Sequence, residues 1–406
     1  MADGPMDKGP AGPWLTIVGV GEDGWDGLAG PARAAIDAAD MVMGPARHLA
    51  LLGQHRGRAV EWPVPFADGI APLLAQRGRR VVALASGDPF WFGAGSSLTR
   101  HLEPGEWIAH PAPSTFSLAA ARLGWAVQDM ACIALHAAPV TRLRPHLAPG
   151  RRIVALLRDG AAASEVAAYL KDQGFGASTL HLLEALGGPR ERVRAIRADA
   201  PMPEDIVHPV AIGIDCAGEG RVLPCASGIA DDWFDHDGQI SKRPVRALTL
   251  SALAPRPGET LWDIGAGSGS IGIEWLLAHP ANRTVALEAD PLRAARIRAN
   301  AAALGVDRIE ILIGRAPDLL PDGVPDAIFI GGGLSQALLE RLWARLPAGR
   351  RLVANAVTLE SEALLARWQA DKGGDLLRID LAQAAPIGSR RGWRASYPLV
   401  QWSVSL

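Results

Sequence analysis

In the first half of the chain, short apolar runs alternate with longer, alanine-rich stretches. The runs are typical of buried strands, and the clearest are Leu15–Val20, Val81–Ala85, Ile153–Leu157 and Val210–Ile214. Between them the spacing of apolar residues predicts helices over Pro31–Ala39, Phe116–Leu123 and Ala162–Gln173. This alternation indicates an α/β fold, in which helices flank a sheet.

The pattern weakens after Gly213 and then restarts in a more regular form. Strands are expected at Thr260–Ile264, Arg283–Glu288, Ile309–Ile313, Ala327–Ile330, Arg351–Ala354, Leu376–Leu381 and Tyr397–Val404. Helices are expected at Val245–Leu253, from Ile271 onward, and at Pro291–Leu304. Repeated βαβ units of this size predict a doubly wound, mostly parallel sheet.

The length of 406 residues suggests more than one domain, since a domain has roughly 150 residues. We expect a disordered leader at 1–13, an α/β domain at 14–215, a polar linker at 216–238 and a Rossmann-like α/β domain at 239–406. The leader has no apolar core of the kind that a signal peptide carries.

Composition and charge narrow the classes of partner. The formal net charge is −2, so no global basic field attracts nucleic acid or an anionic membrane. No apolar run approaches the roughly 18 residues of a spanning helix. The three cysteines fit no zinc motif, and we expect a reduced, cytoplasmic protein without a metal. Only four basic residues are Lys, so most are Arg. The base composition of the genome is one explanation for this excess, and Arg forks that suit a substrate with many carboxylates are the other.

The strongest local motif is a glycine loop that follows the strand Thr260–Ile264. Gly267, Gly269 and Gly272 satisfy G-x-G-x-x-G, and a helix follows, so the backbone can approach a ligand at a helix N-terminus. Asp263 lies just before the loop, where a carboxylate suits a ligand with an ammonium group. Glu288 ends the next strand, where an acid can accept both ribose hydroxyls. These features favour S-adenosylmethionine over a nicotinamide cofactor. Asp290 could bind the ribose in place of Glu288, or it could cap the helix that follows.

The second half resembles the C-terminal domain of the precorrin-6Y C5,15-methyltransferases (decarboxylating) of cobalamin synthesis. The resemblance rests on DGQISKR at 237–243, PGETLWDIGAGSGSIGIEW from Pro257, GRAP at 314–317 and IGGG at 330–333. By this resemblance the cofactor is surrounded by Ser241, Gly265, Ala266, Gly267, Ser268, Gly269, Glu288 and Ala316. The family often has Thr at the position of Ser241, and the hydroxyl is retained.

The first half resembles the tetrapyrrole methylase family over roughly Trp14–Ile214. Its motifs are IVGVGEDGWDGL, LASGDPFWFG, PAPSTFSLAAARLGW and LGGPRER. Each is a common turn by itself, whereas together they imply a two-lobed fold that binds S-adenosylmethionine in a cleft without the G-x-G-x-G loop. By resemblance the cleft is lined by Gly21, Ser86, Gly87, Asp88, Ser114 and Thr115.

The two resemblances imply a bifunctional methyltransferase that acts on precorrin-6B. The first domain would methylate C-5, and the second would methylate C-15 and decarboxylate the C-12 acetate to give precorrin-8. Each domain would bind one S-adenosylmethionine, and we expect a homo-oligomer without nucleic-acid or membrane partners. An NAD(P)-dependent oxidoreductase and a catalytically silent tetrapyrrole-binding protein are the alternatives.

Catalytic groups are less defined, because methyl transfer from a sulfonium needs alignment more than acid–base help. Lys242 is a candidate for holding a substrate carboxylate or is a surface charge, and Asn355 is a candidate substrate contact or caps a turn. Arg390, Arg391 and Arg394 are expected in a basic loop that suits peripheral carboxylates or is simply solvated.

Overall fold

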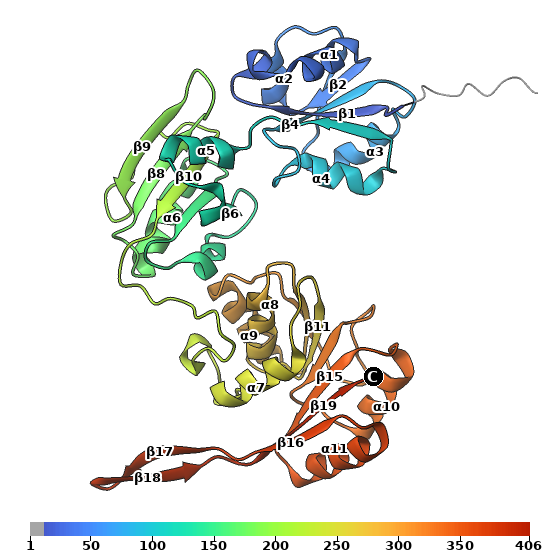
Figure 1. Cartoon of the computed structure of the whole chain (residues 1–406), viewed down its shortest axis with the longest axis vertical. Helices are drawn as coiled ribbons and strands as arrows, with labels where there is room; N and C mark the ends of the chain where they lie inside the picture. The colour runs from blue at the N-terminus through green and yellow to red at the C-terminus, as the bar shows by residue number, and fades with distance from the viewer. Residues whose placement is uncertain (1–11) are drawn as a thin grey trace, which may run out of the picture. The chain divides into compact units, whose positions relative to one another are not determined.

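The computed structural model describes residues 12–406 and has two compact units (Figure 1). The first comprises the described residues up to Val140 together with His146–Arg221. The second comprises Thr141–Pro145 and Val222–Leu406. Both are α/β units, as the alternation of apolar runs and helical stretches predicts.

The first unit contains two five-stranded sheets. The first sheet is parallel, with the order β3-β2-β4-β1-β5. Its strands are β1 (Leu15–Val20), β2 (Met41–Gly44), β3 (Arg58–Glu61), β4 (Val81–Ser86) and β5 (Trp107–His110). Its helices are α1 (Gly30–Ala38), α2 (Ala46–Leu52), α3 (Ile70–Leu74) and α4 (Ala94–Leu98).

The second sheet of this unit is mixed, with the order β6-β7-β10-β8-β9. Only the β6–β7 pair is parallel. Its strands are β6 (Met130–Ala134), β7 (Arg152–Leu156), β8 (Thr179–Glu184), β9 (Arg192–Arg197) and β10 (Val210–Asp215), accompanied by helices α5 (Thr115–Leu123) and α6 (Ala161–Asp172). The two sheets give the two lobes that the tetrapyrrole methylase resemblance implies.

The second unit is built on a seven-stranded sheet with the order β13-β12-β11-β14-β15-β19-β16. The strands are β11 (Thr260–Ile264), β12 (Arg283–Glu288), β13 (Glu310–Ile313), β14 (Ala327–Ile330), β15 (Arg351–Ala356), β16 (Asp375–Ile379) and β19 (Leu399–Ser405). Strands β11 to β15 run parallel, and β19 is antiparallel to both of its neighbours. The chain steps outward from β11 in both directions, so the carboxyl end of β11 is a topological switch point, where such sheets bind ligands.

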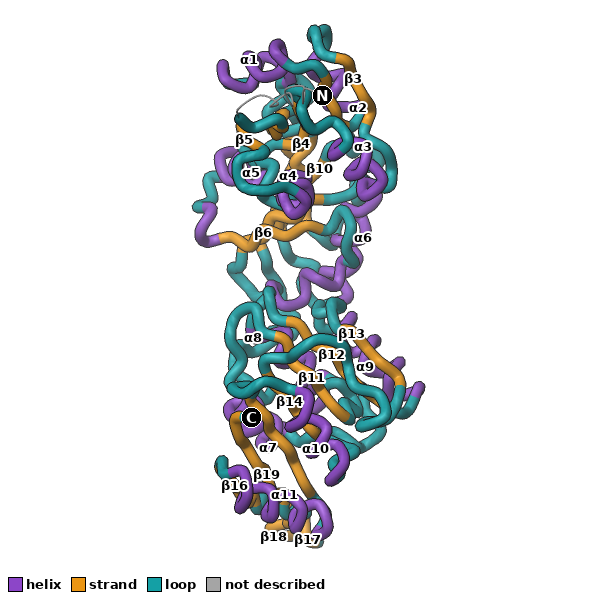
Figure 2. Tube along the Cα trace, turned by 90° about the vertical axis from the view of Figure 1, so that its right-hand side faces the viewer, coloured by secondary structure: helices purple, strands orange, loops and turns teal. Residues whose placement is uncertain are grey.

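Five helices accompany this sheet: α7 (Arg243–Leu253), α8 (Ser270–Ala278), α9 (Pro291–Ala303), α10 (Gln336–Arg345) and α11 (Leu359–Lys372) (Figure 2). Apolar clusters cover both faces of the sheet. Leu261 packs with Trp275 and Phe329 on one face, whereas its neighbour Trp262 packs with Leu339 and Trp402 on the other. Burial on both faces explains why the strands read as continuous apolar runs.

The segment predicted as a linker, 216–238, belongs to the second unit from Val222 onward. Leu223, Ile229 and Phe234 are buried in a cluster with residues of α8 and α9. The amides of Gly228 and Ile229 donate to the buried carboxylate of Glu274 at 2.6 and 3.2 Å. The later residues of this polar stretch are therefore part of the second unit, because their apolar side chains complete its core.

Arg390, Arg391 and Arg394 lie on a strand, and the expectation of a loop is wrong. Strands β17 (Ala382–Ile387) and β18 (Arg390–Ala395) form an antiparallel ribbon that extends away from the seven-stranded sheet (Figure 1). The three Arg side chains are exposed, and Trp393 between them is 78% exposed. Local sequence did not reveal the pairing, since the ribbon buries almost no apolar surface.

Candidate functional site

The glycine loop at the end of β11 adopts a backbone that only glycine accommodates easily. Gly265, Gly267 and Gly269 have φ of +70°, +61° and +78°. A Cβ at Gly265 would lie 2.6 Å from the backbone of Gly332, and one at Gly269 would lie 2.7 Å from the side chain of Ile297. At Gly267 the nearest atom would be the carbonyl oxygen of Gln239, at 3.8 Å. Gly265 and Gly269 are therefore needed for packing, whereas Gly267 borders open space.

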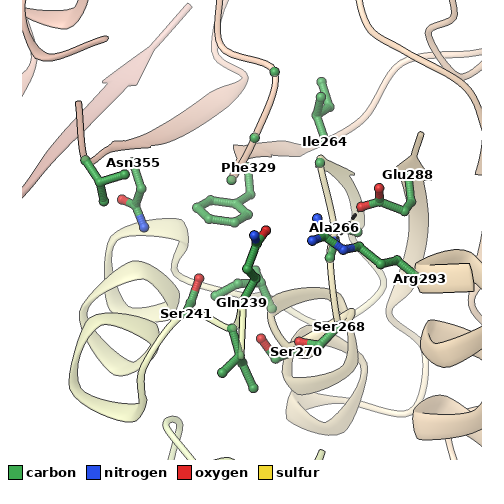
Figure 3. Close-up of a pocket in the computed structure, with 18 of the residues that line it drawn as sticks. Gln239, Ser241, Ile264, Ala266, Ser268, Ser270, Glu288, Arg293, Phe329 and Asn355 are labelled. Atoms are coloured by element: carbon green, nitrogen blue, oxygen red, sulfur yellow. Dashed lines mark hydrogen bonds between the residues drawn. The ribbon is translucent and has the colours of Figure 1, made fainter. Parts of the chain in front are cut away.

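That space is a cavity of about 1100 Å³ at the carboxyl ends of the parallel strands (Figure 3). The predicted residues that line it are Ser241, Lys242, Gly265, Ala266, Gly267, Ser268, Glu288, Ala316 and Asn355. Asp263, Gly269, Arg390, Arg391 and Arg394 are not among the lining residues. The structure thus brings together predicted residues from five separate segments of the second half.

Glu288 stands at the end of β12, across from the loop. Its Oε2 accepts a hydrogen bond from the Gly267 amide at 2.8 Å, and its Oε1 accepts one from the Asp290 amide at 3.0 Å. A carboxylate has about four acceptor positions, so Glu288 can still accept the two hydroxyls of a ribose. Asp290 caps α9, with its Oδ1 accepting from the Leu292 amide at 2.8 Å.

We expected Asp263 to bind the ammonium group of a ligand, but its side chain does not face this cavity. Side chains alternate along a strand, so Ile264 reaches the cavity while Asp263 points toward α8. Its Oδ2 accepts from the Gly272 amide at 3.0 Å, and the residue is 1% exposed. Burial, with the Glu288 charge as a smaller contribution, raises the pKa of Asp263 to about 7. Asp263 therefore fixes the junction of loop and helix.

The cavity fits a nucleoside cofactor such as S-adenosylmethionine. The Oγ of Ser268 is buried without a hydrogen-bond partner among the described residues, and Ser268 lines the cavity. An unsatisfied buried hydroxyl costs free energy that a ligand can restore. The open space at Gly267, the carboxylate of Glu288 and this hydroxyl match the backbone approach, ribose contact and polar contact that such a ligand needs.

Lys242 and Asn355 lie in different settings on the cavity wall. Lys242 precedes α7, and its side chain is exposed. Asn355, at the end of β15, is held by Thr249 and Gln401 through hydrogen bonds of 3.0 Å. Asn355 does not cap a turn, because its side-chain amide bonds to the side chains of Thr249 and Gln401.

The first unit has a second cavity, of about 500 Å³. All six residues expected from the tetrapyrrole methylase motifs line it: Gly21, Ser86, Gly87, Asp88, Ser114 and Thr115. Ser114 also caps α5, since its Oγ accepts from the Ser117 amide at 3.1 Å. Gly87 has a φ of +52°, and a Cβ there would lie 2.9 Å from the carbonyl oxygen of Pro113, so this turn must be tight.

Sequence reasoning missed a polar cluster in this second cavity. The buried His48 places its Nε2 3.0 Å from the Ser86 Oγ and 2.9 Å from the Arg47 guanidinium. Arg47 forms an ion pair with Glu22. Burial and the neighbouring Arg47 lower the pKa of His48 to about 4, so the imidazole is neutral at pH 7. No motif spacing could have found this cluster, because Arg47 and His48 lie on α2 whereas Ser86 ends β4 and Glu22 follows β1.

Family comparisons match the two halves separately. A family model described as tetrapyrrole (corrin/porphyrin) methylases matches residues 14–200, and one described as a precorrin methyltransferase domain matches 232–406. Over 397 residues the chain is 49% identical to a precorrin-6Y C(5,15)-methyltransferase [decarboxylating] of a Sinorhizobium species, with 96% of each chain covered. This chain belongs to the precorrin-6Y C(5,15)-methyltransferase (decarboxylating) family.

A second family member, from Mycobacterium tuberculosis (strain CDC 1551 / Oshkosh), is 40% identical over 403 residues, covering 96% of this chain and 99% of its own. Among solved structures, the C-terminal domain of the precorrin-6Y C5,15-methyltransferase from Rhodobacter capsulatus is 52% identical. The match covers 100% of that solved domain and 45% of this chain, with a TM-score of 0.43. In the part of our chain that the structure describes, no helix is long and apolar enough to cross a membrane.

Proposed function

We propose that this chain is a bifunctional S-adenosylmethionine-dependent methyltransferase of cobalamin biosynthesis. It methylates precorrin-6B at C-5 and C-15 and decarboxylates the C-12 acetate side chain to give precorrin-8. The observation that carries this proposal is the presence of two separate cavities in units of different fold, each lined by the residues of its own family motif. A single methylation would not need both, and the full-length relatives are named for both positions.

Each unit binds one S-adenosylmethionine in this proposal. In the second unit Glu288 accepts the ribose hydroxyls, the backbone of Gly265–Ser268 lies along the nucleoside, and Ser241 and Ala316 complete the site. In the first unit Gly21, Ser86, Gly87, Asp88, Ser114 and Thr115 hold the cofactor. The bound cofactor supplies an electrophilic methyl group on a sulfonium.

The residues of this chain have to align the reactants and exclude water. A reduced tetrapyrrole offers enamine-like meso carbons, so no protein nucleophile is required. For decarboxylation the protonated macrocycle accepts the electron pair, and the protein orients and desolvates the leaving carboxylate. Lys242 at the cavity rim holds a substrate carboxylate.

We assign C-5 methylation to the first unit, and C-15 methylation with decarboxylation to the second. Arg390, Arg391 and Arg394 lie outside the residues that line the cavity, and they attract peripheral carboxylates of the substrate from the exposed ribbon. We further propose a cytoplasmic homo-oligomer that binds no resident metal, nucleic acid or membrane. Analytical ultracentrifugation tests the oligomeric state.

Mass spectrometry of the product tests the proposal directly. The expected product has gained two methyl groups and lost one carbon dioxide per macrocycle. Calorimetry with S-adenosylhomocysteine and with NADPH separates the methyltransferase from an oxidoreductase, since only the former binds the first ligand. Binding of the macrocycle without turnover would instead indicate a silent tetrapyrrole-binding protein.

A further inference from the structure

Three polar side chains, two of them buried, meet where β15 and β19 close one end of the larger cavity. Asn355 and Gln401 lie directly opposite each other on these antiparallel strands, and Thr249 of α7 contacts both. The three donor–acceptor distances are each 3.0 Å. Thr249 is fully buried and Gln401 is 3% exposed, whereas Asn355 is half-buried and lines the cavity.

Counting donors fixes the orientation of the two amides. A single terminal atom of Gln401 contacts both Thr249 and Asn355, while Asn355 uses one amide atom for each neighbour. If that Gln401 atom were oxygen, it would face the Asn355 oxygen with no proton between them. If Asn355 were turned over as well, the single hydroxyl proton of Thr249 would have to serve two acceptors at once. With nitrogen there, Gln401 donates to both neighbours, and the Asn355 Nδ2 donates to Thr249. Only this arrangement satisfies all three contacts.

The fixed orientation decides which hydrogen-bonding group the cavity meets. The Oδ1 of Asn355 accepts from Gln401, and one N–H of Nδ2 is used by Thr249. The second N–H of Nδ2 points away from Thr249. In Figure 3 the Asn355 side chain reaches in on the same side as Ser241, while Glu288 and Arg293 lie on the opposite side. Asn355 thus presents a neutral donor at the end of the cavity away from the ribose acceptor.

We infer that the second N–H of Asn355 binds a carboxylate oxygen of the macrocycle, and that Thr249 and Gln401 are positioning residues that hold this donor in place. The inference rests on the proposed function, which puts a tetrapyrrole with acidic side chains beside the cofactor. A cavity of about 1100 Å³ exceeds the usual range for one small ligand. A donor at this point selects acceptors such as carboxylates and offers nothing to the ring N–H groups.

Asn355→Asp tests the donor. The introduced carboxylate can accept from Gln401 and from the Thr249 hydroxyl, so the buried contacts survive, but it sets an anionic acceptor against the substrate carboxylate. Loss of a hydrogen bond to a charged group corresponds to roughly a 10- to 100-fold rise in KM for the macrocycle in the decarboxylation assay. The affinity for S-adenosylhomocysteine should stay unchanged, which also reports that the variant is folded.

Gln401→Glu tests the positioning role through pH. An ionised carboxyl at position 401 only accepts, so the Asn355 amide turns its nitrogen toward it and presents oxygen to the cavity. Protonation restores one donor, and burial raises the pKa of such a carboxyl. We expect KM for the macrocycle to be raised at about pH 8 and to fall back toward the wild-type value at about pH 6. Gln369→Glu, outside the residues lining the cavity, is the matched control and should show no such dependence.

The outcomes separate this inference from the proposed function. If the wild-type full chain releases carbon dioxide but both variants keep its KM at every pH, the inference is wrong. If Asn355→Asp loses S-adenosylhomocysteine binding, Asn355 is structural and the inference is equally wrong. If the wild-type chain neither methylates nor decarboxylates the macrocycle, the proposed function itself is wrong.

Discussion

Gly267→Ala is the substitution that best distinguishes a ligand-binding loop from one that only packs. At Gly267 a Cβ would project into open space, with the Gln239 carbonyl oxygen 3.8 Å away. The fold therefore meets no clash, and the cost is the left-handed backbone at φ +61°, about 1–2 kcal/mol. For a unit of this size that cost lowers Tm by about 2–8 °C.

Cofactor binding should suffer more than stability does. In the proposed site, the added methyl group occupies the space into which the cofactor would pack beside the loop. Steric intrusion into a packed contact costs roughly 1–3 kcal/mol, which raises Kd about 5- to 150-fold. Isothermal calorimetry with S-adenosylhomocysteine measures the affinity, and thermal denaturation of the same sample measures the stability.

Two further variants isolate the causes. Gly349→Ala also puts a side chain on a backbone with positive φ, at +86°, and no atom lies near the new Cβ. Because Gly349 lies outside the cavity lining, this variant should lower Tm without changing Kd. Gly265→Ala drives its Cβ to 2.6 Å from the backbone of Gly332, so it should cost several kcal/mol more than Gly267→Ala. A folded Gly267→Ala variant with wild-type affinity for S-adenosylhomocysteine would refute our placement of the cofactor.

Three other predictions concern the second unit. Glu288→Gln should weaken S-adenosylhomocysteine binding by about 1.5–3 kcal/mol, because the amide accepts with one oxygen where the carboxylate used two. C-5 methylation by the first unit should persist in this variant. Loss of both activities would argue against independent sites. The pKa of Asp263 is raised from 3.8 to about 7 in the folded state, so its contribution to stability is complete below about pH 4 and is lost as pH rises to about 7. Asp263→Asn should remove this pH dependence, and melting curves that stay parallel to the wild type from pH 4 to 7 would contradict it. A fragment 222–406 should fold and bind S-adenosylhomocysteine, whereas 239–406 should not, because it lacks the buried Ile229 and Phe234; circular dichroism and calorimetry on both fragments check this.

The sequence predicted the buried strands of the second unit well, whereas in the first unit it did not identify the buried strands β2 and β8. Thr260–Ile264, Arg283–Glu288 and Ala327–Ile330 coincide with β11, β12 and β14, since strands buried on both faces are apolar without interruption. Edge elements carry a weaker signal. β9 and the β17–β18 ribbon alternate or expose most side chains, and the sequence analysis did not identify them as strands.

The candidate sites were predictable where a motif is local. The glycine loop and Glu288 could be found because a tight turn demands glycine and a strand end demands a fixed spacing. The side-chain direction of Asp263 and the burial of Phe234 could not be predicted, because each depends on which helix packs against that residue.

The sequence by itself determined the fold class, the family and the glycine loop of the candidate site. These properties depend on residues near one another in the chain, through periodicity, backbone conformation and spacing. Only the tertiary structure decided that His48 meets Ser86, and that Asn355, Thr249 and Gln401 share one hydrogen-bond network. Such contacts join residues 38 to 152 positions apart. Their geometry is set by strand register and helix packing, which no local pattern encodes.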